Sequence, residues 1–232
     1  RFMPSIPGYV YAQKKDSLYI NLFVEGHASI DFEGFKLGIT QETRYPWDGK
    51  VAMILRPDRP HEFTIKIRIP GWALDQPLPG GLYSYLDEVN DSPLLKVNGE
   101  EVFLEMEKGY VSVQREWKTG DLIELSLPMP VRRVQSRMEV KENSGKTAIV
   151  RGPLVYCAEW PDNEGFVSNL VLPDDTELAP EWREEFLNGL TVIKGRSVAL
   201  LGGGEEGNIG RKEQEFVAIP YYAWAHRGQG EM

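Results

Sequence analysis

The sequence predicts an all-β protein made of two consecutive antiparallel β-sandwich domains of the jelly-roll kind, with one short helix. Apolar and polar residues alternate along much of the chain, as in strands that bury one face and expose the other. These runs are short and end at glycine, proline or asparagine-glycine pairs, which are typical of turns. The 232 residues suffice for two sandwiches, since such domains often have about 100 residues and single cores rarely exceed about 250.

Alternating runs predict the strands of the first domain. The clearest run, residues 63–69, places its apolar side chains on one face and ends at Pro70, which cannot donate a ladder hydrogen bond. Asn98-Gly99 tolerates the two positive φ angles of a type I′ turn, so the apolar runs on either side of it predict a β-hairpin. Similar alternation predicts strands at residues 18–24, 51–55, 111–113 and 123–127.

Pro128-Met129-Pro130 interrupts the strand pattern, and we place the domain boundary there. The first sandwich then spans residues 13–128 and the second spans residues 129–232. A strand that crosses from one sheet to another is the alternative explanation for these prolines. Beyond them, further strands are predicted at residues 131–140, 147–158, 190–193, 197–201 and 215–225.

The short helix is predicted between Pro180 and Gly189. Pro180 suits the first turn, Trp182 and Phe186 lie four residues apart on one side, and Asn188-Gly189 suits the C-terminal cap.

The charge pattern argues against two classes of partner. The chain has 26 basic and 35 acidic residues, a formal charge of -9, whereas nucleic acids and anionic membranes attract basic surfaces. No apolar run approaches the roughly 18–20 residues of a membrane-spanning helix. The sequence opens at Arg1 without a signal-peptide pattern, so we interpret it as a piece of a longer protein. Its compartment, whether cytoplasmic or periplasmic and secreted, is therefore not determined by the sequence.

The residue types that usually carry catalysis form no convincing pattern. Glycoside hydrolysis commonly needs two carboxylates about 5–10 Å apart, and no acidic pair stands out among the charged loops. His27, His61 and His226 lack metal-ligand spacing, and Cys157 is the single cysteine. Cys157 lies in an apolar run and is interpreted as a buried structural thiol. We therefore predict no catalytic residue and no metal or other cofactor site in this chain.

Aromatic side chains are the remaining candidates for binding. Trp47 follows Pro46 and precedes Asp48-Gly49, so it lies in a predicted turn where it could stack on a sugar. Tyr45, Trp47 and Asp48 are accordingly the candidate substrate-binding residues. The alternative, which we favour for Trp47, is a structural plug beneath the turn or a contact between domains.

A set of motifs along nearly the whole chain resembles glycoside hydrolase family 127, the β-L-arabinofuranosidase-like enzymes. The motifs are residues 5–11 and 18–23, Tyr45-Pro46-Trp47-Asp48-Gly49, Ile69-Pro70-Gly71-Trp72, Val97-Asn98-Gly99, residues 151–156 and residues 219–228. Each motif is weak alone, but their order and spacing together are specific.

The resemblance implies a parent enzyme with an (α/α)6 barrel followed by two β-sandwiches. This chain would be the sandwiches, with residues 1–12 as the linker from the missing barrel. The family's mechanism implies a cysteine nucleophile and a zinc ion held by further cysteines and a glutamate, all upstream of Arg1. Its nucleophile motif is absent here, and Cys157 matches a strand of the family instead, so no catalytic role passes to it.

Two functional hypotheses follow for the chain itself. In the first, the sandwiches support the missing catalytic barrel, with a homodimer surface as an additional expectation, and an exposed apolar surface should lie near residues 1–11 and Trp47. In the second, they form an autonomous carbohydrate-binding module. Arabinose-containing glycans are the implied substrates of the parent.

Overall fold

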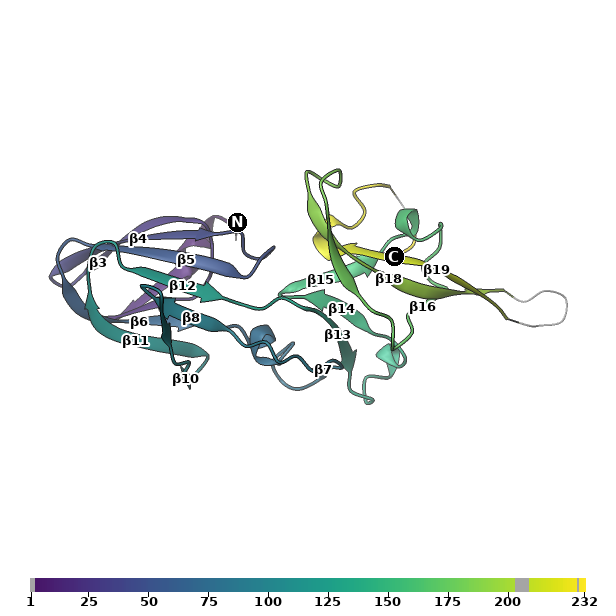
Figure 1. Ribbon diagram of the computed structural model, residues 1–232, viewed down its shortest axis with the longest axis horizontal. Coiled ribbons are helices and arrows are strands. Elements are labelled where there is room, and N and C mark those ends of the chain that lie inside the picture. Colours follow the sequence, from purple (N-terminus) through teal and green to yellow (C-terminus); the bar gives the residue numbers. More distant parts are fainter. Residues whose placement is uncertain (1–2, 203–208, 229) are drawn as a thin grey trace. The chain divides into compact units, whose positions relative to one another are not determined.

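The computed structural model describes residues 3–202, 209–228 and 230–232, and its regular elements are mostly strands (Figure 1). The expectation of an all-β chain with two consecutive β domains is confirmed. No helix among the described residues is long and apolar enough to cross a membrane. The chain folds into two compact units. The first consists of residues 1–81 and 89–129, and the second of residues 82–88 and 130–232.

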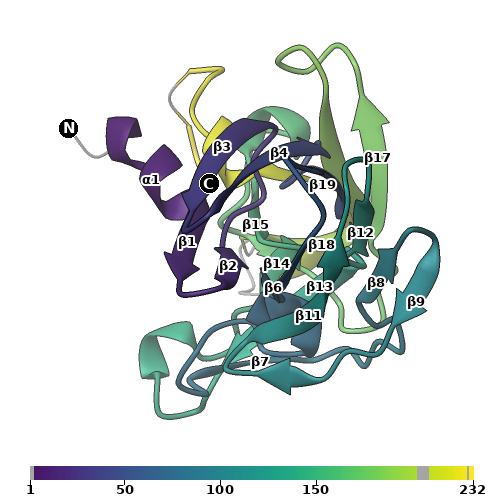
Figure 2. The same ribbon diagram turned by 90° about the vertical axis from the view of Figure 1, so that its left-hand side faces the viewer.

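The first unit contains two sheets, seen in Figures 1 and 2. The five-stranded sheet has the order β1-β2-β6-β11-β10, and only its β2 and β6 pair in parallel. Its strands are β1 (Tyr11–Lys14), β2 (Ser17–Ile20), β6 (His61–Arg68), β10 (Met106–Glu107) and β11 (Tyr110–Trp117). The six-stranded antiparallel sheet, ordered β3-β4-β5-β12-β8-β9, consists of β3 (Gly26–Phe32), β4 (Phe35–Thr43), β5 (Lys50–Pro57), β8 (Leu94–Val97), β9 (Glu100–Val102) and β12 (Leu122–Ser126).

The core of the first unit consists of the apolar residues that alternate along the predicted strands. Phe63, Ile65 and Ile67 of β6 are buried, as are the alternate residues of β5, and both sets belong to one apolar cluster. Trp117 is fully buried in the same cluster, and its indole N–H donates to the carbonyl of Phe63 at 3.0 Å. Because β2 and β6 of one sheet and β4, β5, β8 and β12 of the other put alternate side chains into this cluster, the core fixes the register of both sheets.

The predicted hairpin at Asn98-Gly99 is confirmed. Asn98 and Gly99 have φ angles of 53° and 83°, and β8 pairs with β9 across the turn. The Asn98 side chain also donates to the Asp121 carboxylate at 2.9 Å and accepts from the Leu122 N–H at 2.9 Å. The turn is therefore tied to β12 as well as to its own strands.

The strand predicted at residues 18–24 is shorter than expected. β2 ends at Ile20, and after it Phe23 is buried while Leu22 and Val24 are exposed. Phe23 packs edge-on against Tyr45, with ring centroids 5.6 Å apart. The alternation shifts by one residue because this aromatic contact, rather than a strand partner, decides which side chain is buried.

The second unit is one curled eight-stranded sheet with the order β16-β18-β19-β15-β14-β13-β7, to which β17 adds by pairing with β18. Its strands are β7 (Tyr83–Tyr85), β13 (Val131–Ser136), β14 (Ala148–Arg151), β15 (Leu154–Ala158), β16 (Leu170–Val171), β17 (Ala179–Arg183), β18 (Leu190–Leu201) and β19 (Gly210–Pro220). Two apolar clusters lie within it, one around Phe216 and one around Val217. Consecutive residues of β19 thus point into different clusters, which is why residues 216–220 of this strand are apolar on both faces.

One strand of this sheet comes from between strands of the first unit. β7 pairs with β13, the Arg133 N–H donates to the Asp87 carboxylate at 2.7 Å, and the Arg132 guanidinium lies 3.5 Å from the centroid of the Tyr85 ring. Residues 82–88 therefore complete the second unit, although the sequence reasoning placed them inside a continuous first domain.

The helix predicted between Pro180 and Gly189 is wrong. Residues 179–183 form β17, with Glu181 opposite Val192 of β18, and the predicted helix cap is the turn of this hairpin. Leu187 and Asn188 have φ angles of 46° and 65°. Gly189 has a φ of 100°, and a Cβ there would lie 2.3 Å from the Trp182 ring. Pairing with the longer strand β18 outweighs the local helix propensity of this segment. Gly189 is needed for the hairpin turn rather than for a helix cap.

Over the residues that the structure describes, the single α-helix is α1 (Pro7–Val10), which is followed directly by β1. The remaining helical segments are 3-10 turns at η1 (Met3–Ser5), η2 (Gly71–Leu74), η3 (Lys141–Asn143), η4 (Trp160–Asp162) and η5 (Tyr221–Ala223).

A matched pair of phenylalanines tests the core of the first unit. Phe63 is 1% exposed and Phe103 is 87% exposed. We expect Phe63→Ala to lower the free energy of unfolding by about 3–5 kcal/mol, because it opens a cavity in the core. Phe103→Ala should change it by no more than about 0.5 kcal/mol. Urea denaturation of both variants measures the difference, and equal effects would show that the core is misplaced.

Candidate functional site

The three predicted binding residues have three different environments. Tyr45 is half-buried, its ring packs against Trp72 with centroids 6.5 Å apart, and burial raises the pKa of its hydroxyl. The side chain of Asp48 accepts the N–H of Lys50 at 2.9 Å, which closes the turn. Trp47 is 49% exposed, so it is not a plug buried under the turn. Of the three, Trp47 is the most exposed, whereas the Tyr45 ring lies against Trp72.

Gly49 shows why this turn needs its sequence. A Cβ at Gly49 would lie 1.8 Å from the carbonyl oxygen of Leu127, and the Gly49 carbonyl accepts the N–H of Leu127 at 2.9 Å. No other residue could approach the neighbouring backbone this closely. The Trp-Asp-Gly sequence thus ends in a structurally required glycine next to an exposed tryptophan.

A pocket of about 380 Å³ lies beside the Tyr45–Trp72 pair, in the first unit. Trp72 and Tyr110 line it together with Arg68, Lys108 and Gln76. The rest of its wall is apolar and rich in proline, and none of the described residues that line it is acidic. We refer to it as the Trp72 pocket. Sequence reasoning missed it, although Ile69-Pro70-Gly71-Trp72 had been singled out as a motif.

The backbone around Trp72 holds the pocket in shape. The Ala73 N–H donates to Pro70 at 3.0 Å and the Gln76 N–H donates to Gly71 at 2.9 Å, which closes the η2 turn. Asp75 ends this turn in the left-handed conformation, with a φ of 61°. On the other side, the Ile69 N–H donates to the Gly109 carbonyl at 3.0 Å and thereby ties β6 to the turn between β10 and β11.

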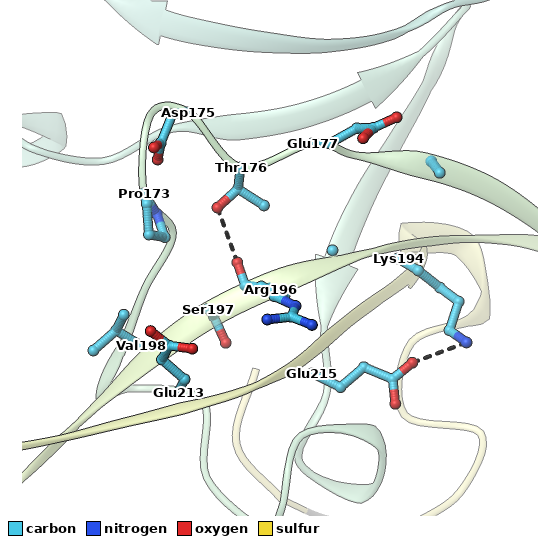
Figure 3. A pocket seen from close by; sticks show the side chains of 12 residues that line it. Pro173, Asp175, Thr176, Glu177, Lys194, Arg196, Ser197, Val198, Glu213 and Glu215 are labelled. Carbon is cyan, nitrogen blue, oxygen red and sulfur yellow. Dashed lines mark hydrogen bonds and ion pairs between the residues drawn. The ribbon is translucent and has the colours of Figure 1, made fainter.

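A larger cavity of about 760 Å³ lies in the second unit, between the loop at residues 173–177 and strands β18 and β19 (Figure 3). Acidic and basic side chains line it together, and Lys194 and Glu215 form an ion pair in its wall. Lys194 contacts Glu215 at 2.8 Å and Glu181 at 3.2 Å, and the Thr176 hydroxyl donates to the Arg196 carbonyl at 3.1 Å. No aromatic residue is among the described residues that line it. The cavity therefore offers no aromatic stacking surface among these residues.

Within the part of the chain that the structure describes, no group of three or more His, Cys, Asp and Glu residues could hold a metal ion. His27 and His61 lie on β3 and β6, and His226 follows η5, so the fold does not bring them together as a metal site. The zinc ion implied by the resemblance is expected upstream of Arg1, so its site stays a prediction.

Cys157 is a free thiol on β15 and is partly buried. Burial, and then the nearby Glu159 carboxylate, raise the pKa of this thiol, whereas Arg227 lowers it, and the net result is a pKa of about 11. A thiol with so high a pKa is almost wholly protonated at neutral pH and is a poor nucleophile. The environment of Cys157 thus agrees with a structural role.

A polar cluster in the second unit surrounds Arg227. Its guanidinium contacts Glu159 at 2.5 Å and Asp162 at 2.6 Å and lies 4.5 Å from the centroid of the Phe186 ring. Hydrogen bonds with Asp162 and Glu159 raise the pKa of Arg227, so it stays charged. Glu159 also accepts the N–H of Ala225 at 2.7 Å. This cluster fixes the segment after β19 against η4.

Asn163 extends the cluster to the sheet. Its side chain donates to the Val217 carbonyl at 2.9 Å and accepts the Val217 N–H at 3.1 Å. Only 1% of Asn163 is exposed, so both bonds are shielded from water. The motif at residues 219–228 is therefore explained by packing in this unit, and no catalytic geometry is needed to account for Arg227.

Replacing Arg227 tests how much this cluster contributes to stability. Arg227→Gln leaves two buried carboxylates without their cation, so we expect a loss of about 3 kcal/mol in the free energy of unfolding. Lys212 and Glu164 form an exposed ion pair in the same unit, and Lys212→Gln should cost less than about 1 kcal/mol. Urea denaturation measures the free energy of unfolding of both variants. If Arg227→Gln lost no more stability than Lys212→Gln, the Arg227 cluster would not be a stabilising buried cluster.

The reactivity of Cys157 follows from its raised pKa. At about pH 7.5 a thiol-alkylating reagent should react with Cys157 much more slowly than with free cysteine, and the rate should rise towards pH 11. Mass spectrometry of timed samples measures the rate. Alkylation as fast as that of free cysteine at neutral pH would show that the thiol is activated.

Two family models cover the chain. The model of the β-L-arabinofuranosidase GH127 middle domain matches residues 17–129, and that of the glycoside hydrolase family 127 C-terminal domain matches residues 131–232.

Individual relatives agree with these models. The chain is 29% identical to a non-reducing end β-L-arabinofuranosidase of Bifidobacterium longum subsp. longum, over all of this chain and 35% of that protein. A solved GH127 β-arabinofuranosidase is 40% identical with a TM-score of 0.93, over 99% of this chain and 36% of that one. A GH127 β-L-arabinofuranosidase from Geobacillus stearothermophilus T6 is 34% identical with a TM-score of 0.85, over 99% and 35%. The chain thus spans about a third of the length of these relatives, and it belongs to glycoside hydrolase family 127, whose middle and C-terminal domains it carries.

Proposed function

We propose that this chain is the non-catalytic β-sandwich part of a glycoside hydrolase resembling β-L-arabinofuranosidases and that it supports a catalytic barrel elsewhere in the same protein. The observation that supports the proposal is that this chain matches only the middle and C-terminal domains of the family. Middle-domain and C-terminal-domain models account for residues 17–129 and 131–232, while the relatives are nearly three times as long as this chain. The catalytic residues are then sought in the remaining two thirds.

The surface of the first unit supports a covering partner. Met3, Tyr9 and Trp47 are 73%, 57% and 49% exposed, at the positions where the resemblance places the side next to the barrel. Exposed large apolar side chains of this kind are available to a domain that covers this part of the chain. Homodimerisation through the same sandwiches stays a prediction.

The proposed reaction of the whole protein is retaining hydrolysis of arabinose-containing glycans by a cysteine nucleophile and a zinc ion. Both would be supplied outside this chain, since Cys157 is protonated and the described residues do not fit a metal ion. The sandwiches would contribute by stabilising the barrel.

The alternative is an autonomous carbohydrate-binding module. The Trp72 pocket favours it, because aromatic rings and polar side chains meet there in a concave site. The two functions are separable, since one requires turnover by the whole protein and the other requires only binding by this chain.

Hydrolysis assays test the proposal directly. We expect a synthetic aryl β-L-arabinofuranoside to be cleaved by the longer protein that contains this chain and to be untouched by the 232-residue chain alone. A chelator should abolish the activity of the longer protein, and added zinc should restore it. Cleavage by the isolated chain would refute the non-catalytic assignment, and an inactive longer protein would refute the proposed parent activity.

A further inference from the structure

The Trp72 pocket has an unusual charge for this protein. The whole chain carries a formal charge of -9, yet Arg68 and Lys108 are the only charged residues among the described residues that line the pocket. The acidic side chain closest to Lys108 in the sequence is Glu107, and its carboxylate lies 3.7 Å from the ammonium group of Lys66. The pocket is therefore a local basic site on an acidic protein.

The fold brings the two cations to one end of the five-stranded sheet. Arg68 is the last residue of β6 and stands opposite Tyr110 in the register with β11. Lys108 occupies the turn just before Tyr110, with a φ of 53°, and the backbone bond from Ile69 to Gly109 fixes this turn beside β6. A ligand in the pocket would meet a guanidinium and an ammonium group together.

The aromatic walls are held before any ligand binds. The Tyr110 hydroxyl donates to the Asn21 side chain at 2.7 Å, and its ring meets Tyr19 edge-on at 5.4 Å. Trp72 packs against Tyr45 on the core side. Fixed rings reduce the entropy that binding would otherwise cost.

The same surface continues beyond the pocket. The Lys66 ammonium group lies 5.6 Å from the centroid of the Tyr19 ring, on the face of the sheet that also carries Tyr110. Aromatic rings with cations beside them thus extend along β2 and β6. A ligand of more than one unit could follow this path.

We propose that the Trp72 pocket binds a carboxylated sugar, such as a uronic acid residue. Arg68 and Lys108 would hold the carboxylate, Gln76 would hydrogen-bond to hydroxyl groups, and the rings of Trp72 and Tyr110 would contact the apolar face of the sugar. The volume of about 380 Å³ lies at the small end of the range for small-molecule sites, which suits one or two sugar units.

An acidic peptide is the less suitable ligand. Extended peptides are usually bound along a free strand edge or a long groove, where their backbone can be paired. The Trp72 pocket is instead closed on one side by the η2 turn and the segment up to Pro79. A ring with a carboxylate and several hydroxyl groups matches the mixture of side chains better.

Ligand-detected NMR on the 232-residue chain tests the proposal with four probes. These are D-galacturonate, its neutral methyl ester, acetate and a glutamate-rich peptide. We expect D-galacturonate to bind best, the ester to bind at least about tenfold more weakly because it lacks the charge, and acetate to bind more weakly because it lacks the ring. Binding should also weaken with added salt.

Variants locate the site. Arg68→Gln and Lys108→Gln should each weaken D-galacturonate binding by about tenfold, since each removes one charged contact. Lys50→Gln is the matched control, because Lys50 is exposed and begins β5 in the other sheet. Circular dichroism confirms that the variants are folded.

Four results would overturn the proposal: no binding of D-galacturonate, equal binding of its ester, binding of acetate or the peptide as tight as that of D-galacturonate, or full binding by both charge variants. The outcome does not depend on the proposed hydrolytic function, because the assay measures binding by this chain without turnover.

Discussion

The register of the strands in the first unit is the constraint on which its other features depend. Phe63, Ile65 and Ile67 enter the core together, so a shift of one residue would expose all three. The same register puts Lys66 and Arg68 on the outer face and sets Arg68 opposite Tyr110. The core thereby decides which charged and aromatic side chains share a surface, and the Trp72 pocket is a consequence of burial on the opposite face.

Much of this architecture could be predicted because its signals are local. The hairpin at Asn98-Gly99 requires two positive φ angles at adjacent residues, and the alternation in β5 and β6 is visible within eight residues. The predicted helix near Pro180 failed for the converse reason. Its local signals were plausible, but β17 is decided by pairing with β18, a partner that local propensity does not include. The sequence also could not show that β7, which lies between strands of the first unit along the chain, belongs to the second unit. Its place is decided by pairing with β13, which is distant in the sequence.

The sites were harder to predict than the fold. Tyr45 and Trp72 were both noticed as parts of motifs, but only the fold brings their rings together. The Arg227 cluster joins positions on either side of β18 and β19, and none of its members is unusual in its own sequence context. Charged residues are so common on surfaces that a sequence cannot distinguish the few that are buried and paired. Burial, rather than residue type, gives these groups their importance.

The net charge of the chain predicts its interaction with large charged partners better than its interaction with small ligands. A charge of -9 disfavours large anionic partners, which respond to the field of the whole surface. A small ligand responds mainly to groups within about one Debye length, roughly 8–10 Å in physiological salt. Within the Trp72 pocket those groups include Arg68 and Lys108, while Glu107 is already paired with Lys66. An acidic protein can therefore exclude nucleic acid and still bind a carboxylate, because the two interactions depend on charges summed over different distances.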